Sequence, residues 1–570
     1  MSLKKHGIGE LAKARSQSLG LVGWVFLFSI FVNLLMLVGP IFMLQVYDRV
    51  LASGSEATLV AMFALVAALY ALMSLLDFAR GRIMARFGAR LQEALDTRVF
   101  EVVLKRSILP QERSAPQRAL HDLEVIRSIL ASPGFLAILD FPWVPVFIAA
   151  LFIFHPLMGW LGIAGAIVLI VLAVVNQFLT RKKIPDMQTA SARSHGLAEE
   201  ARRHIEIVRA HGMSGQIVPR WNEMRETGQD FAMAHNDLSG AFQASTKAFR
   251  LFLQSAMLAL GAWLVLQAEL TAGAMIAGSI ILGRALAPIE QSLSQLMPLQ
   301  GAGAAWRSLG DLLAKTPPEE KKTELPRPEP RLSVKSVAVS PVGSATAILS
   351  QVDFSMEPGD IIGVVGPSGS GKSSLLRTLV GVWPPRAGEV RLGPARLDQY
   401  DPSMLGGYVG YLPQEVDFFS GSVAENIARM AVEPDEAEVI RAAKAACVHE
   451  LILTLPQGYD TIMKSGETDL SAGQKQRIAL ARALYGDPAF LVLDEPNSAL
   501  DADGQQALTE AILKMKTDGK IVIISSHHPA GLAAVDRLIV LGNGTVVAQG
   551  PRDQILKSMI AAIEKNRKAG

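Results

Sequence analysis

A glycine-rich run at residues 366–374 carries the clearest chemistry in this sequence. It reads GPSGSGKSS, follows a β-branched run at 361–365 and precedes the helical pattern LLRTLVG. In such a strand–loop–helix unit, glycines let backbone N–H groups curl around an anion at the start of the helix. We therefore predict a phosphate-binding loop, in which Lys372 reaches the β- and γ-phosphates of a nucleotide and the Ser373 hydroxyl binds Mg²⁺. The loop consists of Gly366, Pro367, Ser368, Gly369, Ser370, Gly371, Lys372, Ser373 and Ser374.

A second chemical signal is the run FLVLDE, which ends in Asp494 and Glu495. A short apolar run of this kind is typical of a buried strand, which here delivers two carboxylates to one edge of a sheet. We expect Asp494 to hold Mg²⁺, directly or through water, and Glu495 to act as general base on the attacking water. The loop followed by these acids predicts a P-loop ATPase that uses ATP and Mg²⁺.

The elements that position these residues belong to a carboxyl-terminal domain. Beyond residue 330, short β-rich runs alternate with helical runs, a pattern typical of an α/β fold. The stretch before it, residues 317–330, is rich in proline and charged residues and shows no hydrophobic period. That composition is typical of a stiff linker. We therefore predict a linker at 317–330 and a nucleotide-binding domain at 331–570.

The first half of the chain has the composition of a membrane domain. Half of the 570 residues are hydrophobic, and residues 16–47 contain no Asp, Glu, Lys or Arg. About 20 apolar residues are enough for a helix to cross a bilayer core. We predict a cytoplasmic N-terminal segment at 1–19 and a six-helix transmembrane domain at 20–316. The expected spans are 20–45, 56–77, 134–154, 157–179, 249–268 and 271–293.

The distribution of positive charge gives these spans an orientation. Lys and Arg collect before the first span and in two long helical excursions, 80–133 and 180–248, whereas the alternate connections are short and poor in positive charge. By the positive-inside rule, both termini and both excursions lie in the cytoplasm. The net charge of +2 gives no sign of a nucleic-acid partner, and the single cysteine, Cys447, excludes an internal disulfide.

Two charged residues within the predicted spans each have two interpretations. Asp140 lies near the start of the third span, where Pro142 and Pro145 favour an irregular, hydrated helix start. It either lines a translocation path or is a carboxylate favoured by the positive end of a helix. Arg284, in the sixth span, either extends its head group toward the membrane surface or lines the same path.

The order of the remaining motifs resembles that of the ABC transporter family. LSAGQKQRIALARAL, at 470–484, resembles the ABC signature and its helix, YLPQ the Q-loop, SALD the D-loop and ISSHHP the switch-histidine segment. The resemblance implies that Gln414 senses Mg²⁺ and the attacking water, and that His527 contacts the γ-phosphate and holds Glu495 in place. It further implies nucleotide contacts by the signature and D-loop residues Ser471, Gly473, Gln474 and Asp501.

The same resemblance implies a homodimer. One chain carries one phosphate loop and one signature, and the family pairs these from different domains, so Ser471 and Gly473 would clamp the γ-phosphate bound to the opposite subunit. Two features depart from the family pattern. Ala472 replaces a glycine of the signature, which is acceptable where φ is negative. Residues 336–342 contain no aromatic side chain to stack on the adenine.

Six spans followed by one ATPase domain resemble the half-transporter plan of ABC exporters, with coupling helices near 105–125 and 200–213. The predicted fold is an α-helical membrane domain of six transmembrane helices, of the ABC exporter type, followed by an α/β P-loop ABC ATPase domain.

The runs PIFMLQVYDRVL, DFPWVPVF, ENIAR and GVWPP resemble type I secretion ABC transporters, with the protease and lipase secretion subgroup the most similar. This resemblance implies a multi-pass protein of the inner membrane of a Gram-negative cell. Its substrate would be an unfolded polypeptide with a C-terminal secretion signal, and its partners a periplasmic adaptor, an outer-membrane tunnel protein and membrane lipid. The alternatives are a lipid or drug exporter, and a nucleotide-gated channel or regulatory ABC protein that does not pump.

Overall fold

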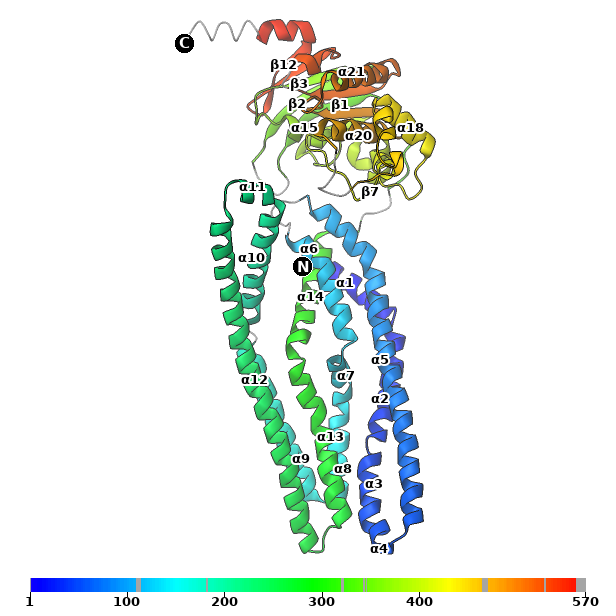
Figure 1. Cartoon of the computed structure of the whole chain (residues 1–570), viewed down its shortest axis with the longest axis vertical. Coiled ribbons are helices and arrows are strands. Elements are labelled where there is room, and N and C mark those ends of the chain that lie inside the picture. Colours follow the sequence, from blue (N-terminus) through cyan, green and yellow to red (C-terminus); the bar gives the residue numbers. More distant parts are fainter. Residues whose placement is uncertain are drawn as a thin grey trace. The chain divides into compact units, whose positions relative to one another are not determined.

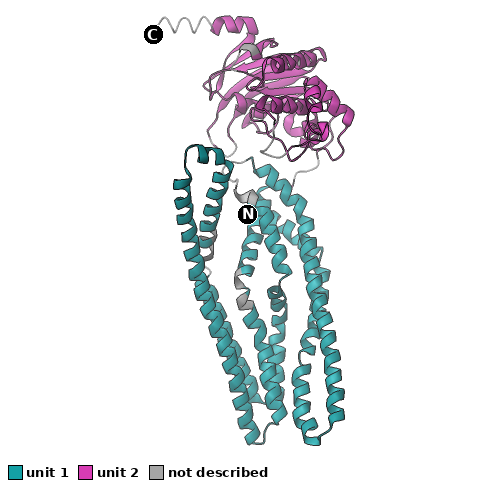
Figure 2. Cartoon of the chain, viewed as in Figure 1, with its two compact units in different colours: residues 1–108, 112–317 teal, residues 109–111, 318–570 magenta. Residues whose placement is uncertain are grey.

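The computed structural model describes residues 2–108, 114–180, 183–318, 322–341, 344, 346–463, 470–526 and 529–559. The chain divides into two compact units (Figure 2). One lies within residues 1–317 and is helical throughout its described residues. The other is formed by residues 318–570 and contains the sheets.

The helices of the first unit include two of more than 50 residues, α5 and α12, which run along its whole length (Figure 1). The elements are α1 (Ser2–Ser16), α2 (Leu19–Leu35), α3 (Val38–Gln45), the π-helix η1 (Val46–Val50), α4 (Leu51–Ser53), α5 (Glu56–Arg106), α6 (Ser114–Leu130), α7 (Pro133–Asp140), the 3₁₀ turn η3 (Phe141–Trp143), α8 (Val144–Phe154), α9 (Pro156–Thr180), α10 (Lys183–Arg203), α11 (Ile205–Ala210), α12 (Ser214–Leu266), α13 (Ala272–Ser294) and α14 (Leu296–Lys315).

Six helical segments of the described chain are long and apolar enough to cross a membrane, which confirms the predicted number of spans. They are Leu19–Ser53, Glu56–Arg106, Pro133–Phe154, Pro156–Thr180, Ser214–Leu266 and Ala272–Gln291. The second and fifth segments are the whole of α5 and α12, and the turns of these two helices outside the apolar stretch are rich in charged residues. The third span breaks at η3, where Pro142 and Pro145 interrupt the hydrogen bonding of an α-helix.

The three connections that the sequence predicted to be short lie at the same end of this unit. Asp48, in η1, accepts hydrogen bonds from the Thr271 hydroxyl at 2.6 Å and from the Gly273 N–H at 2.9 Å. Its carboxylate therefore satisfies free N–H groups at the start of α13, where the helix dipole favours negative charge. Between the next two connections, His155 Nε2 lies 3.2 Å from Glu269 Oε2.

At the other end of this unit, the helices extend beyond the apolar stretches. The short helix α11 separates α10 from α12 within the range predicted for a coupling helix. The range predicted for the other coupling helix, 105–125, includes residues 109–113, which lie outside the described residues. The N-terminal helix α1 packs against α14, with Leu11 and Leu309 fully buried in one apolar cluster.

Asp140 makes buried contacts that neither of its two interpretations included, and both interpretations stay predictions. Asp140 is the last residue of α7 and the N-cap residue of η3, so it lies at the end of one helical element and at the start of the next. It is only 7% exposed and forms an ion pair with Arg80 of α5. Asn33 of α2 donates a further hydrogen bond to it at 2.9 Å. Arg284, by contrast, is exposed on α13, and its two interpretations stay open.

The second unit contains a six-stranded sheet with the order β12-β11-β3-β10-β9-β6, parallel except for β12. A four-stranded antiparallel sheet has the order β2-β1-β4-β5. The strands are β1 (Leu332–Val339), β2 (Leu349–Met356), β3 (Ile361–Val365), β4 (Ala387–Leu392), β5 (Ala395–Arg396), β6 (Val409–Leu412), β7 (Gly421–Ser422), β8 (Ile462–Met463), β9 (Phe490–Asp494), β10 (Ile521–Ser525), β11 (Arg537–Gly542) and β12 (Thr545–Pro551).

Apolar residues pack on both faces of the six-stranded sheet, and its strands β3, β9 and β10 are buried along their whole length. Along β10, Val522 and Ile524 belong to one core cluster, whereas Ile521 and Ile523 belong to another. This alternation follows from the two-residue period of a strand. The helices of this unit are α15 (Lys372–Leu379), α16 (Pro402–Tyr408), α17 (Val423–Ile427), α18 (Glu436–Ala445), α19 (His449–Leu453), α20 (Ala472–Leu484) and α21 (Ala502–Thr517), with 3₁₀ turns η4 (Leu397–Gln399), η5 (Gly458–Asp460) and η6 (Pro529–Leu532).

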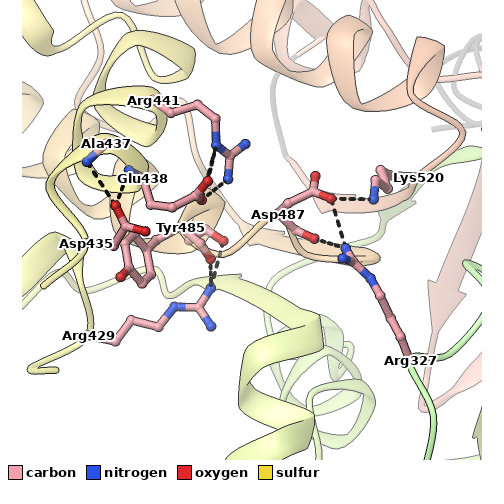
Figure 3. A network of polar contacts seen from close by, with 10 residues as sticks. Arg327, Arg429, Asp435, Ala437, Glu438, Arg441, Tyr485, Asp487 and Lys520 are labelled. Atoms are coloured by element: carbon pink, nitrogen blue, oxygen red, sulfur yellow. Dashed lines mark hydrogen bonds and ion pairs between the residues drawn. The ribbon is translucent and has the colours of Figure 1, made fainter.

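Part of the predicted linker is held by this second unit. Lys322 Nζ donates to the carbonyl of Tyr400 at 3.0 Å, and Arg327 Nη2 lies 2.9 Å from Asp487 Oδ2. Lys520 Nζ approaches the same oxygen at 2.9 Å, so Asp487 lies between two cations (Figure 3). Burial alone would raise the pKa of Asp487, but its hydrogen bonds and ion pairs with these cations lower it. The predicted domain boundaries themselves stay a prediction.

Candidate ATPase site

The phosphate-binding loop connects β3 to α15 at the carboxyl edge of the parallel sheet, where α/β folds place their ligands. Gly371, at the N-cap of α15, has φ +98°, and a Cβ there would lie 2.7 Å from Leu349 Cδ2. A Cβ on Gly366 would lie 2.3 Å from the carbonyl oxygen of Leu541. Both positions therefore require glycine. The Ser370 hydroxyl is buried and has no hydrogen-bond partner among the described residues, as expected of a donor kept for an anion.

Lys372 begins α15 and is buried in the loop. Its Nζ donates to the carbonyl oxygens of Gly366 at 3.0 Å and Pro367 at 3.1 Å. Burial lowers the pKa of Lys372, while the negative charges of Glu495 and Asp494 oppose that change. The ammonium group thus lies in the field of both predicted catalytic acids, at the loop that the sequence predicted to bind phosphates.

The two acids follow one another at the end of β9. Asp494 is 2% exposed, and its Oδ1 accepts a hydrogen bond from the Ser525 hydroxyl at 2.5 Å. The Glu495 N–H donates to the same hydroxyl at 3.0 Å and to the Ser525 carbonyl at 3.2 Å. Ser525 ends β10, which lies between β9 and β3 in the sheet.

The main chain of Glu495 adopts φ +49°, a left-handed conformation that is unfavourable for a residue with a side chain. Its carbonyl oxygen accepts a hydrogen bond from Gln476 Nε2 at 3.4 Å, and Gln476 Oε1 accepts one from the N–H of Ala499 at 3.2 Å. Its carboxylate oxygen Oε2 lies 3.2 Å from Gln414 Nε2. The structure thus brings the Q-loop glutamine to the predicted general base.

The signature residues form the start of α20. Ser471 is the N-cap, and its hydroxyl accepts from the Gln474 N–H at 3.3 Å while Gln474 Oε1 accepts from the Ser471 N–H at 2.9 Å. Ala472 is the first helical residue, is exposed and has a negative φ, so the alanine fits the helix as expected. Gly473 lies close to the D-loop, because a Cβ there would approach the carbonyl oxygen of Ala499 to 2.7 Å.

Asp501 and His527 are two further residues that the sequence predicted for the site. Asp501 is the N-cap of α21, and its Oδ1 accepts from the N–H of Gly504 at 2.9 Å. His527, together with the neighbouring His528, lies outside the described residues, so its role stays a prediction. Among the described residues, no hydrogen bond or ion pair joins Ser471 or Gly473 to the phosphate-binding loop.

The donor set fits a nucleotide-bound magnesium ion. Mg²⁺ usually takes one or two carboxylates from a protein, with phosphate oxygens and waters as its other ligands. Asp494 supplies such a carboxylate, and its Oδ1 accepts a hydrogen bond from Ser525. The predicted ligands Ser373 and Gln414 would add a hydroxyl and an amide oxygen. Mg²⁺ bound there would neutralise charge on the phosphates. Ser525 and Gln476 would hold the two acids in place around it.

Two residues of the site were not found from the sequence, Ser525 and Gln476. One feature of the sequence could have indicated Ser525. It is the first polar residue after the apolar run at 521–524, and it ends a strand close to the predicted switch histidine. Gln476 lies within the signature helix, where a glutamine is usually exposed, but here it is only 3% exposed. Its burial depends on the close approach of α20 to the turn after β9.

A six-span helical domain and an α/β domain with this site together define an ABC exporter. Residues 22–286 match the ABC transporter transmembrane region, and residues 349–498 match the ABC transporter family. The chain also resembles the solved structure of a bacterial Atm1-family ABC exporter with ATP bound, with a TM-score of 0.80, 20% identity and coverage of 96% of this chain and 98% of that one. That similarity shows the shared fold.

Proteins with similar sequences identify the kind of ABC exporter to which the chain belongs. The chain is 41% identical to the type I secretion system ATP-binding protein PrsD of Rhizobium meliloti (strain 1021), over 93% of this chain and 91% of PrsD. It is 28% identical to the leukotoxin translocation ATP-binding protein LktB of Mannheimia haemolytica, over 93% of this chain and 75% of LktB. The chain therefore belongs to the ABC transporters of type I secretion systems, and it is a multi-pass membrane protein that couples ATP hydrolysis to export.

Proposed function

We propose that this exporter moves unfolded polypeptides with C-terminal secretion signals out of a Gram-negative cell. The observation that supports this most strongly is the 41% identity to PrsD over nearly the full length of both chains. The similarity to a leukotoxin translocation protein supports the same class of substrate. A periplasmic adaptor and an outer-membrane tunnel protein are the proposed partners, and the inner membrane, with both termini in the cytoplasm, is the proposed location.

The hydrolytic roles are proposed from the contacts at the carboxyl edge of the sheet. Lys372 binds the β- and γ-phosphates, and Ser373, Asp494 and Gln414 hold Mg²⁺. Glu495 accepts a proton from the attacking water, because its carboxylate lies at the end of β9 and contacts Gln414. His527 is proposed to contact the γ-phosphate. The loop backbone, with Ser370 and Ser374, completes the phosphate contacts.

The signature is proposed to act on the nucleotide of a second subunit. Ser471 and Gly473 stand at the start of α20, where free N–H groups and the helix dipole favour an anion. Gln474 and Asp501 belong to the same proposed contact. One chain supplies one loop and one signature. A homodimer with two composite sites is therefore the proposed working form.

A comparison of culture media tests the proposed substrate. Cells that carry the wild-type protein are compared by proteomics with cells that carry Glu495→Gln, both with native adaptor and tunnel genes. Glu510→Gln is the matched control, because Glu510 lies on the exposed face of α21. We expect a few polypeptides to disappear from the Glu495→Gln medium and accumulate inside the cells. Matching media from both strains would reject polypeptide export, and the purified protein would then be assayed with lipids and amphipathic drugs.

The residue roles have their own test in purified protein. Lys372→Ala should lose ATP binding, because no other cation replaces its ammonium group in the loop. Glu495→Gln should retain ATP binding and lose most hydrolysis, by about a hundredfold, the usual scale for a general base. Steady-state hydrolysis near the wild-type rate in Glu495→Gln would remove its assignment as the base.

A further inference from the structure

Ser525 occupies a central position at the nucleotide edge of the sheet. Strand β10 lies between the strand that leads into the phosphate-binding loop and the strand that carries the two acids. In the register of these strands, Ser525 is opposite Val364 on one side and Asp494 on the other. Its side chain is fully buried, although the four preceding residues of the strand are all apolar. A hydroxyl in this place requires partners inside the protein.

Both partners of the Ser525 hydroxyl belong to the pair of acids. The hydroxyl donates its proton to Asp494 Oδ1 at 2.5 Å and accepts the N–H of Glu495 at 3.0 Å. A serine hydroxyl has one donor and two acceptor positions, so it can bridge a carboxylate and an amide. Since Asp494 is 2% exposed, water cannot easily take the place of this donor.

The bridge matters because Glu495 is held in an unfavourable backbone conformation. A left-handed φ of +49° persists only where the surroundings fix the peptide groups on both sides. Ser525 fixes the N–H of Glu495, and Gln476 fixes its carbonyl oxygen. The direction of the Glu495 carboxylate follows from this conformation, as does its contact with Gln414 at 3.2 Å.

We propose that Ser525 is a positioning residue of the ATPase site, which sets the orientation of the Asp494 carboxylate toward Mg²⁺ and of Glu495 toward the attacking water. This inference rests on the proposed roles of those two acids. Removal of the hydroxyl would take from Asp494 Oδ1 its buried donor and from the Glu495 N–H one of its acceptors. Both acids would remain present, but neither would be held at its working position.

The test compares Ser525→Ala, Ser525→Thr and Ile523→Val in the full-length purified protein. Ile523 is also fully buried and lies on the same face of β10, so Ile523→Val removes core volume without touching either acid. We expect Ser525→Ala to lower kcat by about tenfold or more with little change in the KM for ATP, since a hydrogen bond to a carboxylate is lost. Ser525→Thr keeps the hydroxyl, so its kcat should be much closer to that of the wild type. Ile523→Val should keep the wild-type kcat.

A second readout does not depend on turnover. The equilibrium affinity for a fluorescent ATP analogue is measured with Mg²⁺ and with EDTA for each variant. We expect the gain in affinity that Mg²⁺ provides to shrink severalfold in Ser525→Ala and to be preserved in Ile523→Val. A wild-type kcat in Ser525→Ala, or an equal loss in Ile523→Val, would overturn the proposal. If Mg²⁺ raises the affinity of Ser525→Ala for the analogue as much as it does in the wild type, Ser525 does not orient Asp494 toward the metal. The kcat of Glu495→Gln is measured in the same assay. A wild-type kcat in that variant would show that the proposed role of Glu495 as base has failed, independently of the result for Ser525.

Discussion

Arg80 Nη1 lies 2.7 Å from Oδ1 and 3.0 Å from Oδ2 of Asp140, although these residues belong to different membrane-spanning segments. Both side chains are at most 10% exposed. Arg80 also contacts the Asp77 carboxylate at 2.6 Å and the Ser29 hydroxyl at 3.2 Å. The pair thus joins α2, α5 and α7 at the point where the third span changes from α-helix to 3₁₀ turn. A buried charge pair persists where further hydrogen bonds satisfy it, as they do here.

We expect Arg80→Gln to lower the free energy of unfolding by about 3–5 kcal/mol, because it leaves the buried Asp140 carboxylate without its cation. Asp140→Asn should cost less, because Arg80 keeps its contact with Asp77. The double variant Arg80→Gln, Asp140→Asn should be more stable than the sum of the single losses predicts, since neither buried charge remains. Denaturant unfolding of the detergent-solubilised protein measures all three. Arg202→Gln is the control, because Arg202 pairs with Glu199 on an exposed face of α10. Additive losses in the double variant would contradict the coupling of Arg80 to Asp140.

The two adjacent small residues of the signature should respond differently to substitution. A Cβ on Gly473 would lie 2.7 Å from the carbonyl oxygen of Ala499, so Gly473→Ala should displace the D-loop from α20. Ala472 is exposed, and Ala472→Gly should cost about 1 kcal/mol or less of helix stability. We expect ATP hydrolysis to fall by at least tenfold in Gly473→Ala and to stay within about twofold of wild type in Ala472→Gly. Equal rates in the two variants would contradict this packing argument.

Gln476 connects the signature helix to the turn that holds the acids. Its amide bridges the Glu495 carbonyl and the Ala499 N–H, which lie on either side of that turn. Gln476→Leu keeps the volume but loses both hydrogen bonds, and we expect hydrolysis to fall by about tenfold while ATP binding is retained. Gln506→Leu is the control, because Gln506 donates a hydrogen bond to Glu510 on the exposed face of α21, away from the acids. If Gln476→Leu hydrolyses ATP at the wild-type rate, the bridge has no part in positioning Glu495.

The features that the sequence predicted correctly each depend on residues that are close together along the chain. The apolar stretches are long enough to identify six spans, and the loop at 366–374 connects a strand to a helix as its own residues predicted. The break in the third span was expected from Pro142 and Pro145. By contrast, the pairing of Arg80 with Asp140 connects residues 60 positions apart. It depends on how three helices pack, which the hydrophobic period of one helix does not specify.

The same reason explains why Ser525 and Gln476 were missed. Ser525 meets Asp494 only because β10 lies beside β9 in the parallel sheet, and the order of parallel strands does not follow from the order along the chain. Gln476 is buried only because α20 packs next to the turn after β9. Motif spacing identifies the groups predicted to meet the nucleotide, whereas the groups that hold those residues in place come from strand order and helix packing.

Lys372 gives a prediction on pH dependence. Its pKa is lowered by burial, and the charges of Glu495 and Asp494 limit that change. The charged ammonium binds phosphates, so ATP affinity should fall as the pH rises through the lowered pKa of Lys372. Since the pKa is lower in the folded state than in the unfolded state, this group also makes the free energy of unfolding rise with pH between the two values.

Glu495→Gln tests the electrostatic cause of this behaviour. The charge of Glu495 raises the pKa of Lys372 more than that of Asp494 does, so neutralisation of Glu495 should lower that pKa further. We therefore expect the loss of ATP affinity to begin at a lower pH in Glu495→Gln than in the wild type. Binding of a fluorescent ATP analogue between about pH 7 and pH 10 measures both curves, with Glu510→Gln as the control for a distant carboxylate. A curve for Glu495→Gln that coincides with the wild-type curve, or lies at higher pH, would show that Glu495 does not act on Lys372 in this way.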